Sequence, residues 1–174
     1  YKIPLFGKFQ GDNFLLVYAA MKELGIDKKT IKNGLLNVKW PGRFEIFIRN
    51  PLVILDGAHN EDSSLKLVEN LKSISNKEDV CFLTSILEDK DIGKILKNFS
   101  SVADKIVYTS LKDYHRGLGA KEMYDRDIYF DNRKYYENMV EAYNEAKKSK
   151  IVVVAGSFYL LCEFRRVIES ENRL

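Results

Sequence analysis

The sequence predicts an α/β, Rossmann-like fold, in which helices cover both faces of a mostly parallel six-stranded sheet with one antiparallel edge strand. Two observations lead to this prediction. From residue 52 onwards, short apolar runs alternate with helical patterns, and parallel strands require such crossover helices. Before that point, two strand-like segments are separated only by Asn50-Pro51, which indicates an antiparallel pair.

Two helices are expected before the first strand. In residues 13–24, apolar side chains recur at helical spacing and Gly25 ends the pattern. A short second helix follows Asp27, whose carboxylate can cap it. The turn Trp40-Pro41-Gly42 then closes this opening segment.

Strands and helices alternate after this turn. Residues 44–48 alternate with Phe44, Ile46 and Ile48 facing one way, and residues 52–56 form the partner strand. The remaining strands are predicted at residues 80–84, 105–109, 128–130 and 151–155. The remaining helices are predicted at residues 60–74, 92–99, 121–124, 135–148 and 158–169.

Composition excludes several classes of protein. Among 174 residues, 28 are Lys or Arg and 25 are Asp or Glu, and they are spread along the chain without a basic stripe for nucleic acid. No segment reaches the roughly 20 apolar residues of a membrane helix, and no signal-peptide pattern is present. Cys81 and Cys162 lie in apolar runs without metal-type spacing. We expect both to be reduced and buried, in a cytoplasmic protein. Because the chain begins without Met, we expect it to be part of a longer one.

Polar clusters follow four of the predicted strands. Ligands of parallel sheets bind where strands end and helices begin, so these clusters are expected to converge on one edge. They are Asp56 to Asn60, Thr84-Ser85, Thr109-Ser110 and Gly156-Ser157.

Each candidate residue has a functional and a structural interpretation. Asp56 could accept hydrogen bonds from a ribose or satisfy local amides, and His59 could hold a carboxylate or be an ordinary surface histidine. Asn60 is expected to be a helix N-cap. Ser157 could donate to an anion at a helix amino terminus or simply cap that helix. Phe158 is expected to pack.

Two cations complete the candidates. Arg43 could fork onto phosphate or carboxylate oxygens, or be a solvated arginine. Lys90 lies in a charged loop and could meet an anion. No G-x-x-x-x-G-K-[ST] phosphate loop occurs anywhere in the sequence, so the main grip on a nucleotide's phosphates must come from elsewhere.

Four motifs in order resemble folylpolyglutamate synthase and its bifunctional dihydrofolate synthase form, in the Mur ligase superfamily. They are WPGRFE at residues 40–45, LDGAHN at 55–60, DKD at 89–91 and GSFYL at 156–160. Residues 7–13, GKFQGDN, are similar to the family's G-x-H-Q-x-x-N segment, with Phe9 in place of the histidine.

The resemblance implies that residues 1–39 are the carboxyl-terminal helical end of the central ATPase domain with its linker, and 40–174 the glutamate-binding domain. It implies ATP-dependent addition of L-glutamate to a folate or dihydropteroate carboxylate through an acyl phosphate, with the Mg²⁺ ligands in the missing domain. It assigns nucleotide binding to Asn13, Arg43 and Asp56, and glutamate binding to His59, Ser157 and Lys90. Arg43 and His59 are the catalytic residues in this assignment.

Two other interpretations stay open at this point. The chain alone could be a non-catalytic, Rossmann-like nucleotide- or ligand-binding module, or an unrelated flavodoxin-like regulatory module. We expect a monomer with no metal site of its own, no nucleic-acid or membrane partner, and no activity without the missing ATPase domain.

Overall fold

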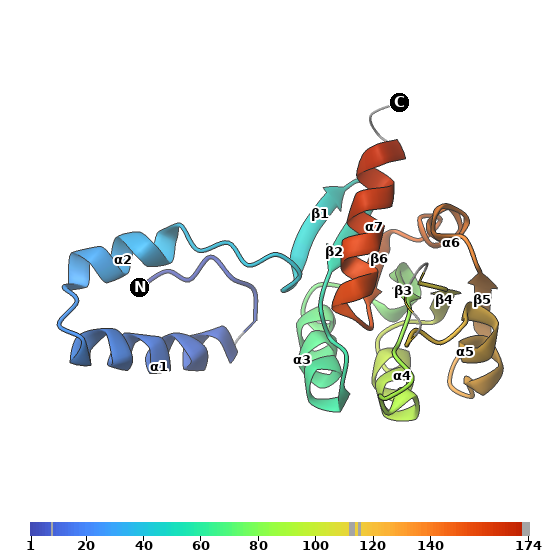
Figure 1. Ribbon diagram of the computed structural model, residues 1–174, viewed down its shortest axis with the longest axis horizontal. Coiled ribbons are helices and arrows are strands. Elements are labelled where there is room, and N and C mark those ends of the chain that lie inside the picture. Colours follow the sequence, from blue (N-terminus) through green and yellow to red (C-terminus); the bar gives the residue numbers. More distant parts are fainter. Residues whose placement is uncertain (8, 112–113, 115, 172–174) are drawn as a thin grey trace.

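The computed structural model describes residues 1–7, 9–111, 114 and 116–171. Its centre is a six-stranded sheet in the order β1-β2-β6-β3-β4-β5 (Figure 1). The strands are β1 (Glu45–Arg49), β2 (Leu52–Leu55), β3 (Val80–Thr84), β4 (Lys105–Thr109), β5 (Asn132–Tyr136) and β6 (Ile151–Ala155). The helices are α1 (Phe9–Glu23), α2 (Lys28–Leu36), α3 (Glu61–Lys72), α4 (Ile92–Ser100), α5 (Ala120–Arg126), α6 (Met139–Ala146) and α7 (Phe158–Glu171), with a 3₁₀ turn at Lys77–Asp79.

The predicted fold class is confirmed. β1 pairs with β2 in antiparallel fashion, and every other neighbouring pair in the sheet is parallel. The chain enters β6 last, and β6 lies between β2 and β3. The loops that follow β2, β6 and β3 therefore lie next to one another at the carboxyl edge of the sheet.

Helices cover both faces of the sheet, as Figure 1 shows. One apolar core contains side chains of α3, α4 and α5, and the other contains side chains of α6 and α7. Val152 and Val154 of β6 belong to one core and Val153 to the other. This central strand is consequently apolar at every position, as expected for a strand covered on both faces.

The first strand departs from the predicted alternation. The register of β1 against β2 shifts between Ile46 and Ile48, so a bulge interrupts the two-residue period. Phe44 is buried, whereas Ile46 is 50% exposed. The prediction that these side chains share one face is therefore wrong.

The last edge strand was also placed wrongly by sequence. The predicted strand at 128–130 lies outside β5, which runs from Asn132 to Tyr136. Helix α6 begins at Met139 rather than near 135, because the Asn138 side chain accepts from the amides of Val140 and Glu141. The predicted caps Asp27 and Asn60 are confirmed.

Residues 1–39 form a helical arm, containing α1 and α2, that extends to one side of the sheet (Figure 1). The arm contacts the rest of the chain near the start of α1. Phe6 stacks on Phe44 with ring centroids 4.3 Å apart, and Lys66 of α3 lies 5.8 Å above the Phe9 ring. The arm is thus attached close to the turn that carries Arg43.

The two cysteines differ in their surroundings. Cys81 is buried, and burial raises the pKa of its thiol to about 12. Cys162 is exposed on α7, so the prediction that both are buried is wrong for Cys162. Within the described ranges, none of the helices has the length and apolar character needed to cross a membrane.

Candidate functional site

Three segments that are far apart in the sequence are joined by backbone hydrogen bonds at the carboxyl edge of the sheet. The Gly57 amide donates to the Gly42 carbonyl at 2.8 Å, and the Gly156 amide donates to the Ala58 carbonyl at 2.9 Å. The turn before β1, the segment after β2 and the segment before α7 are thereby connected. We call this connected region, residues 40–44, 56–60 and 156–158, the site edge.

The four polar clusters lie at one edge of the sheet, as predicted, because β2, β6, β3 and β4 run parallel to one another, and three of them are joined by hydrogen bonds. The Thr84 hydroxyl donates to the Ala155 carbonyl at 2.6 Å, which joins the end of β3 to the end of β6. Ser110, after β4, instead bonds with Glu137 and accepts from the Ala120 amide at 2.8 Å. The fourth cluster therefore belongs to the neighbouring region between β4 and α5.

Asp56 is the buried acid of the site edge. It is 8% exposed, and its two carboxylate oxygens accept from the amides of Phe44 and Ala58, each at 2.9 Å. Burial raises the pKa of Asp56, while the two amides and the charge of Arg43 act in the opposite direction. The structural interpretation, that Asp56 satisfies local amides, is thus confirmed, and lone pairs of the carboxylate are left for a further donor.

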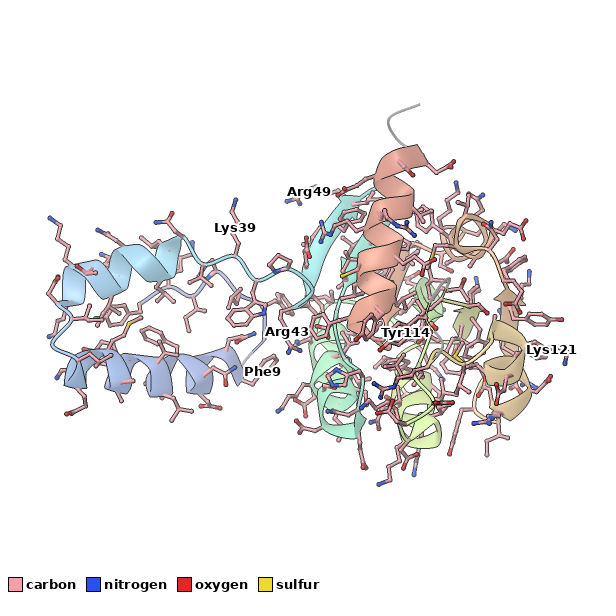
Figure 2. The ribbon with its side chains drawn as sticks, viewed as in Figure 1. Phe9, Lys39, Arg43, Arg49, Tyr114 and Lys121 are labelled. Atoms are coloured by element: carbon pink, nitrogen blue, oxygen red, sulfur yellow. The ribbon has the colours of Figure 1, made fainter. Side chains whose placement is uncertain are left out.

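Arg43 lies where the helical arm meets the sheet, as Figure 2 shows. Its guanidinium carbon is 5.2 Å from the centroid of the Phe158 ring, a cation–π contact. No ion-pair partner of Arg43 is found among the residues that the structure describes. The Asp56 carboxylate feels the charge of Arg43, but no salt bridge among these described residues occupies the guanidinium, which is therefore available to bind an anion.

His59 and Ser157 follow the adjacent parallel strands β2 and β6. Nδ1 of the half-buried His59 lies 2.8 Å from the Gly57 carbonyl. A carbonyl only accepts, so Nδ1 is the protonated nitrogen and Nε2 is left for another partner. The Ser157 hydroxyl accepts from the Leu160 amide at 3.1 Å, which confirms its capping role and leaves its own hydrogen to donate.

Among the described residues, no contact brings the other two predicted residues, Lys90 and Asn13, to this cluster. Lys90 follows β3 at the same edge, and its ammonium lies 2.8 Å from Asp89, which also binds Arg116 at 3.0 Å. Asn13 is an exposed residue of α1 and donates to the Gln10 carboxamide at 3.1 Å.

Phe158 has a larger part in the site than the sequence indicated. Its ring fills the space beside two glycines of the site edge: a Cβ added to Gly57 would lie 2.3 Å from it, and one added to Gly42 would lie 3.2 Å from it. The ring centroid is also 6.2 Å from that of His59. The sequence contains a signal for this contact. The WPGR and DGAHN motifs each carry a glycine, which leaves room for a ring, and the GS motif is followed directly by an aromatic residue.

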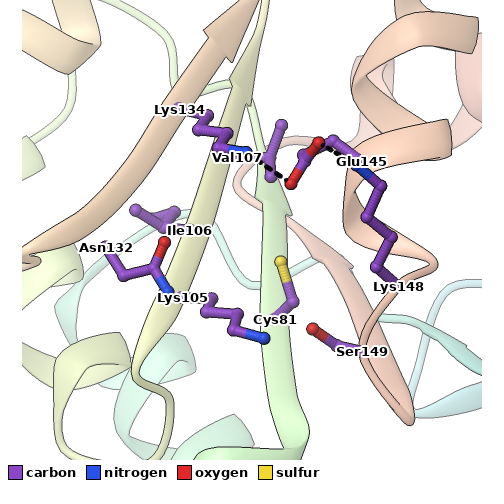
Figure 3. Close-up of a pocket in the computed structure, with 9 residues that line it drawn as sticks. All are labelled: Cys81, Lys105, Ile106, Val107, Asn132, Lys134, Glu145, Lys148 and Ser149. Atoms are coloured by element: carbon purple, nitrogen blue, oxygen red, sulfur yellow. Dashed lines mark hydrogen bonds and ion pairs between the residues drawn. The ribbon is translucent and has the colours of Figure 1, made fainter.

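A concave region lies at the opposite, amino-terminal edge of the sheet, with a volume of about 210 Å³ (Figure 3). Glu145 binds both Lys134 at 2.7 Å and Lys148 at 2.6 Å there. These two hydrogen-bonded cations lower the pKa of Glu145 from 4.5 to about 2. Within the described part of the chain, no group of three His, Cys, Asp or Glu side chains is arranged to hold a metal ion.

Replacing Glu145 with Gln should make the stability less dependent on pH. A carboxyl group whose pKa is lowered on folding stabilises the protein above its ordinary pKa, here 4.5, and loses that effect as the pH falls towards about 2. We expect Glu145→Gln to cost about 1–2 kcal/mol at pH 7, allowing for solvent screening of the exposed lysines. The loss should fall by about half at pH 3.

Urea unfolding at the two pH values measures this difference. Glu141→Gln, on the same helix but exposed, is the matched control. Its free energy of unfolding should be close to that of the unmodified chain at either pH. An equal loss for Glu145→Gln at pH 7 and pH 3 would contradict the assignment of the stabilisation to this ion-pair cluster.

Comparison with known proteins gives consistent matches over this region and beyond it. The family model described as Mur ligase, glutamate ligase domain, matches residues 42–158. A dihydrofolate synthase/folylpolyglutamate synthase of Bacillus subtilis (strain 168) is 31% identical over 95% of this chain and 40% of the relative. The enzyme of the same description from Escherichia coli (strain K12) is 28% identical over 92% of this chain and 38% of the relative.

Solved structures agree with these matches. A Mycobacterium tuberculosis folylpolyglutamate synthase complexed with ADP and AMPPCP superposes with a TM-score of 0.86 at 25% identity, over 95% of this chain and 41% of that chain. A bifunctional folylpolyglutamate synthase/dihydrofolate synthase with Mn, AMPPNP and L-glutamate bound gives a TM-score of 0.79 at 25% identity, over 96% of this chain and 41% of that chain. The present chain thus spans about 40% of the length of each of these four proteins.

Proposed function

Because the chain belongs to the Mur ligase family, with the glutamate ligase domain at residues 42–158, we propose that it is the glutamate-binding part of an ATP-dependent ligase. The longer parent adds L-glutamate to a folate or dihydropteroate carboxylate in this proposal. Residues 40–174 are the glutamate-binding domain, and the helical arm, residues 1–39, is the end of the central ATPase domain with its linker. The descriptions of the relatives support the reaction class.

One observation carries this proposal. The WPGR turn and the GS segment, which are far apart in the sequence, are each hydrogen-bonded to the DGAHN segment between them at the carboxyl edge of a parallel sheet. A cation, a buried acid, an imidazole and a hydroxyl are thereby brought to the place where α/β sheets bind ligands. A purely structural role would not need all four groups at one edge.

The reaction requires a carboxylate to become an acceptor for an amine. Transfer of the γ-phosphate of ATP to a carboxylate oxygen gives an acyl phosphate and ADP. The glutamate nitrogen then attacks the acyl carbon, the amide forms, and inorganic phosphate leaves with the former carboxylate oxygen. Water must be excluded while the acyl phosphate exists, because it would hydrolyse this intermediate.

The nucleotide side of the proposal rests on Arg43, Asp56 and Asn13. Arg43 is a fixed cation and stabilises the negative charge that develops on the transferring phosphate. Asp56 accepts from the ribose through the lone pairs not used by its two amide donors. Asn13 lies near the adenine in this assignment, which rests on the similarity of residues 7–13 to the family segment.

The glutamate side rests on His59, Ser157 and Lys90. When His59 is protonated, Nε2–H donates to a carboxylate of the incoming glutamate, because Nδ1 is held by the Gly57 carbonyl. The Ser157 hydroxyl donates its free hydrogen to the same ligand. The Lys90 ammonium forms an ion pair with Asp89 in this structure. In the proposal, it balances the charge of a substrate carboxylate.

The remaining assignments concern the parent protein. Mg²⁺ accompanies ATP and is held by residues outside this chain, and the folate or dihydropteroate acid is selected there too. We place the enzyme in the cytoplasm as a monomer without nucleic-acid or membrane partners, in accord with its two free cysteines and its nearly balanced 28 basic and 25 acidic residues.

The 174-residue chain by itself should fold but should release no ADP in response to glutamate. The sheet has two cores of its own, which predicts one cooperative thermal transition, whereas no phosphate loop is present to hold ATP. A coupled assay for ADP, run beside the full-length parent, measures the activity, and calorimetry measures the melt. Glutamate-dependent ADP release by the chain alone, or its absence from the parent, would contradict the proposed function.

A further inference from the structure

Three hydrogen bonds hold the backbone on both sides of Arg43, in addition to the bond that the Arg43 amide donates to the Trp40 carbonyl at 3.3 Å. The Gly42 amide donates to Glu45 Oε2 at 2.8 Å, and the Gly42 carbonyl accepts from the Gly57 amide at 2.8 Å. On the other side, the Phe44 amide donates to Asp56 at 2.9 Å. Neither peptide group next to Arg43 can turn without breaking one of these bonds.

The turn is conformationally unfavourable without such support. Gly42 has a φ of 73°, and Phe44 has a φ of 48°, a left-handed conformation that bulky residues rarely adopt. Strained residues of this kind persist where their surroundings hold them, and they gather at functional sites. The contacts that hold this turn therefore fix the position and direction of the Arg43 Cα–Cβ bond.

The Glu45 carboxylate, which accepts from the Gly42 amide, is itself held by an ion pair with a distant segment of the chain. Both carboxylate oxygens of Glu45 accept from Nη2 of Arg165 on α7, each at 2.8 Å. The Arg165 guanidinium also lies 4.8 Å from the Phe47 ring centroid. Arg165 thereby fixes the carboxylate that accepts from the Gly42 amide.

A second contact, made by Phe158, holds the side chain of Arg43. The Phe158 ring lies beneath the Arg43 guanidinium at 5.2 Å and occupies the space that Gly42 and Gly57 leave open. Phe158 and Arg165 are seven residues apart on α7 and so lie on the same face of that helix. A single helix face thus supports both the backbone and the side chain of Arg43.

We propose that Phe158, Glu45 and Arg165 are positioning residues that orient Arg43 for phosphoryl transfer. This inference rests on the proposed function for the role of Arg43, although the geometric claim does not. Because α7 begins immediately after Ser157, the same helix connects the residue proposed to bind glutamate with the residue proposed to stabilise the phosphate. Neither Glu45 nor Arg165 needs to touch a substrate.

Kinetics of the full-length parent test the catalytic part. Glu45→Gln and Arg165→Gln should each lower kcat about 10- to 100-fold, as expected for a misplaced catalytic group, with a smaller change in KM for glutamate. Arg165→Lys keeps a charged donor and should retain more activity than Arg165→Gln. Arg166→Gln, at an exposed position of the same helix, is the matched control, and its kcat should be close to that of the parent.

The deciding arm repeats Glu45→Gln and Arg165→Gln in an Arg43→Ala background. If they act by orienting Arg43, they should change kcat by less than about twofold there, since the group they position is gone. If they reduced kcat by the same factor with and without Arg43, the positioning role would be overturned.

A second readout does not depend on activity. In the 174-residue chain, the Nε–H resonance of Arg43 should shift in Phe158→Leu and in Glu45→Gln, and its order parameter should fall, whereas Arg166→Gln should change neither. An unchanged Arg43 signal in both variants would overturn the inference whatever the parent's activity. A changed signal, together with a parent that lacks glutamate-dependent activity, would support the positioning contacts and reject the proposed function.

Discussion

Replacing Arg43 with alanine in the full-length parent should lower kcat about 100- to 1,000-fold, the range found when one preorganised donor to a developing anion is removed. The structure supports a loss of this size because the guanidinium is held over the Phe158 ring, beside the motifs of the site edge. It forms no salt bridge with a carboxylate within the described residues. Steady-state kinetics with ATP, glutamate and the folate substrate each varied in turn measure the effect.

Arg49→Ala is the matched control, since Arg49 is an exposed arginine at the other end of β1. This variant should keep kcat close to that of the parent, and both variants should unfold at similar urea concentrations. A less than tenfold loss of kcat for Arg43→Ala, or a loss explained by unfolding, would remove Arg43 from the reaction.

Replacing His59 or Ser157 with alanine should raise KM for glutamate about 10- to 100-fold. Each change removes one charge-assisted hydrogen bond to a glutamate carboxylate, worth about 1.5–3 kcal/mol, and every ~1.4 kcal/mol is tenfold in affinity. The two residues follow adjacent strands of one sheet edge, where a single ligand can reach both. KM for ATP should change much less in either variant.

Asp56→Ala provides the opposite pattern in the same assay. It should mainly raise KM for ATP, and it should also reduce stability, since two buried amides lose their acceptor. If His59→Ala raised KM for ATP and left KM for glutamate unchanged, the assignment of the glutamate site would be wrong, although the family membership would stand.

Elements whose side chains face two cores could be predicted well from the sequence. β6 is apolar at all five positions because both faces are covered, and β3 and β4 are predicted with the bounds that the structure gives. Polar residues that follow these strands and precede helices located the carboxyl edge, because parallel strands all end on the same side. This much follows from periodicity and topology alone.

The edge strand β5 could not be predicted in the same way. Its residues include Arg133 and Lys134, and its burial pattern contains no fully buried position, since charged side chains are typical of exposed edges. The apolar run before it misled the prediction: Phe130 is buried, but Ile128 is 81% exposed. Hydrophobicity alone does not distinguish a loop anchored by one phenylalanine from a short strand.

The candidate site shows a similar division. The groups that could contact ligands are recognisable by their chemistry, whereas the contacts that hold them depend on tertiary structure. Nothing local in the sequence indicates that Arg165 reaches Glu45, which is 120 positions away. Likewise, Phe158 follows a helix start like any packing residue, and its place beneath Arg43 is evident only once β2 and β6 are neighbours.

The most direct test of the central claim follows the oxygen of the substrate carboxylate. The full-length parent is supplied with a folate substrate carrying ¹⁸O at both oxygens of the reacting carboxylate, together with ATP and L-glutamate, and the inorganic phosphate is analysed by mass spectrometry. Activation as an acyl phosphate predicts one ¹⁸O atom in phosphate for each glutamyl amide formed. Amide formation without ¹⁸O in phosphate, or no amide with glutamate at all, would contradict the assignment of this chain to an ATP-dependent glutamate ligase.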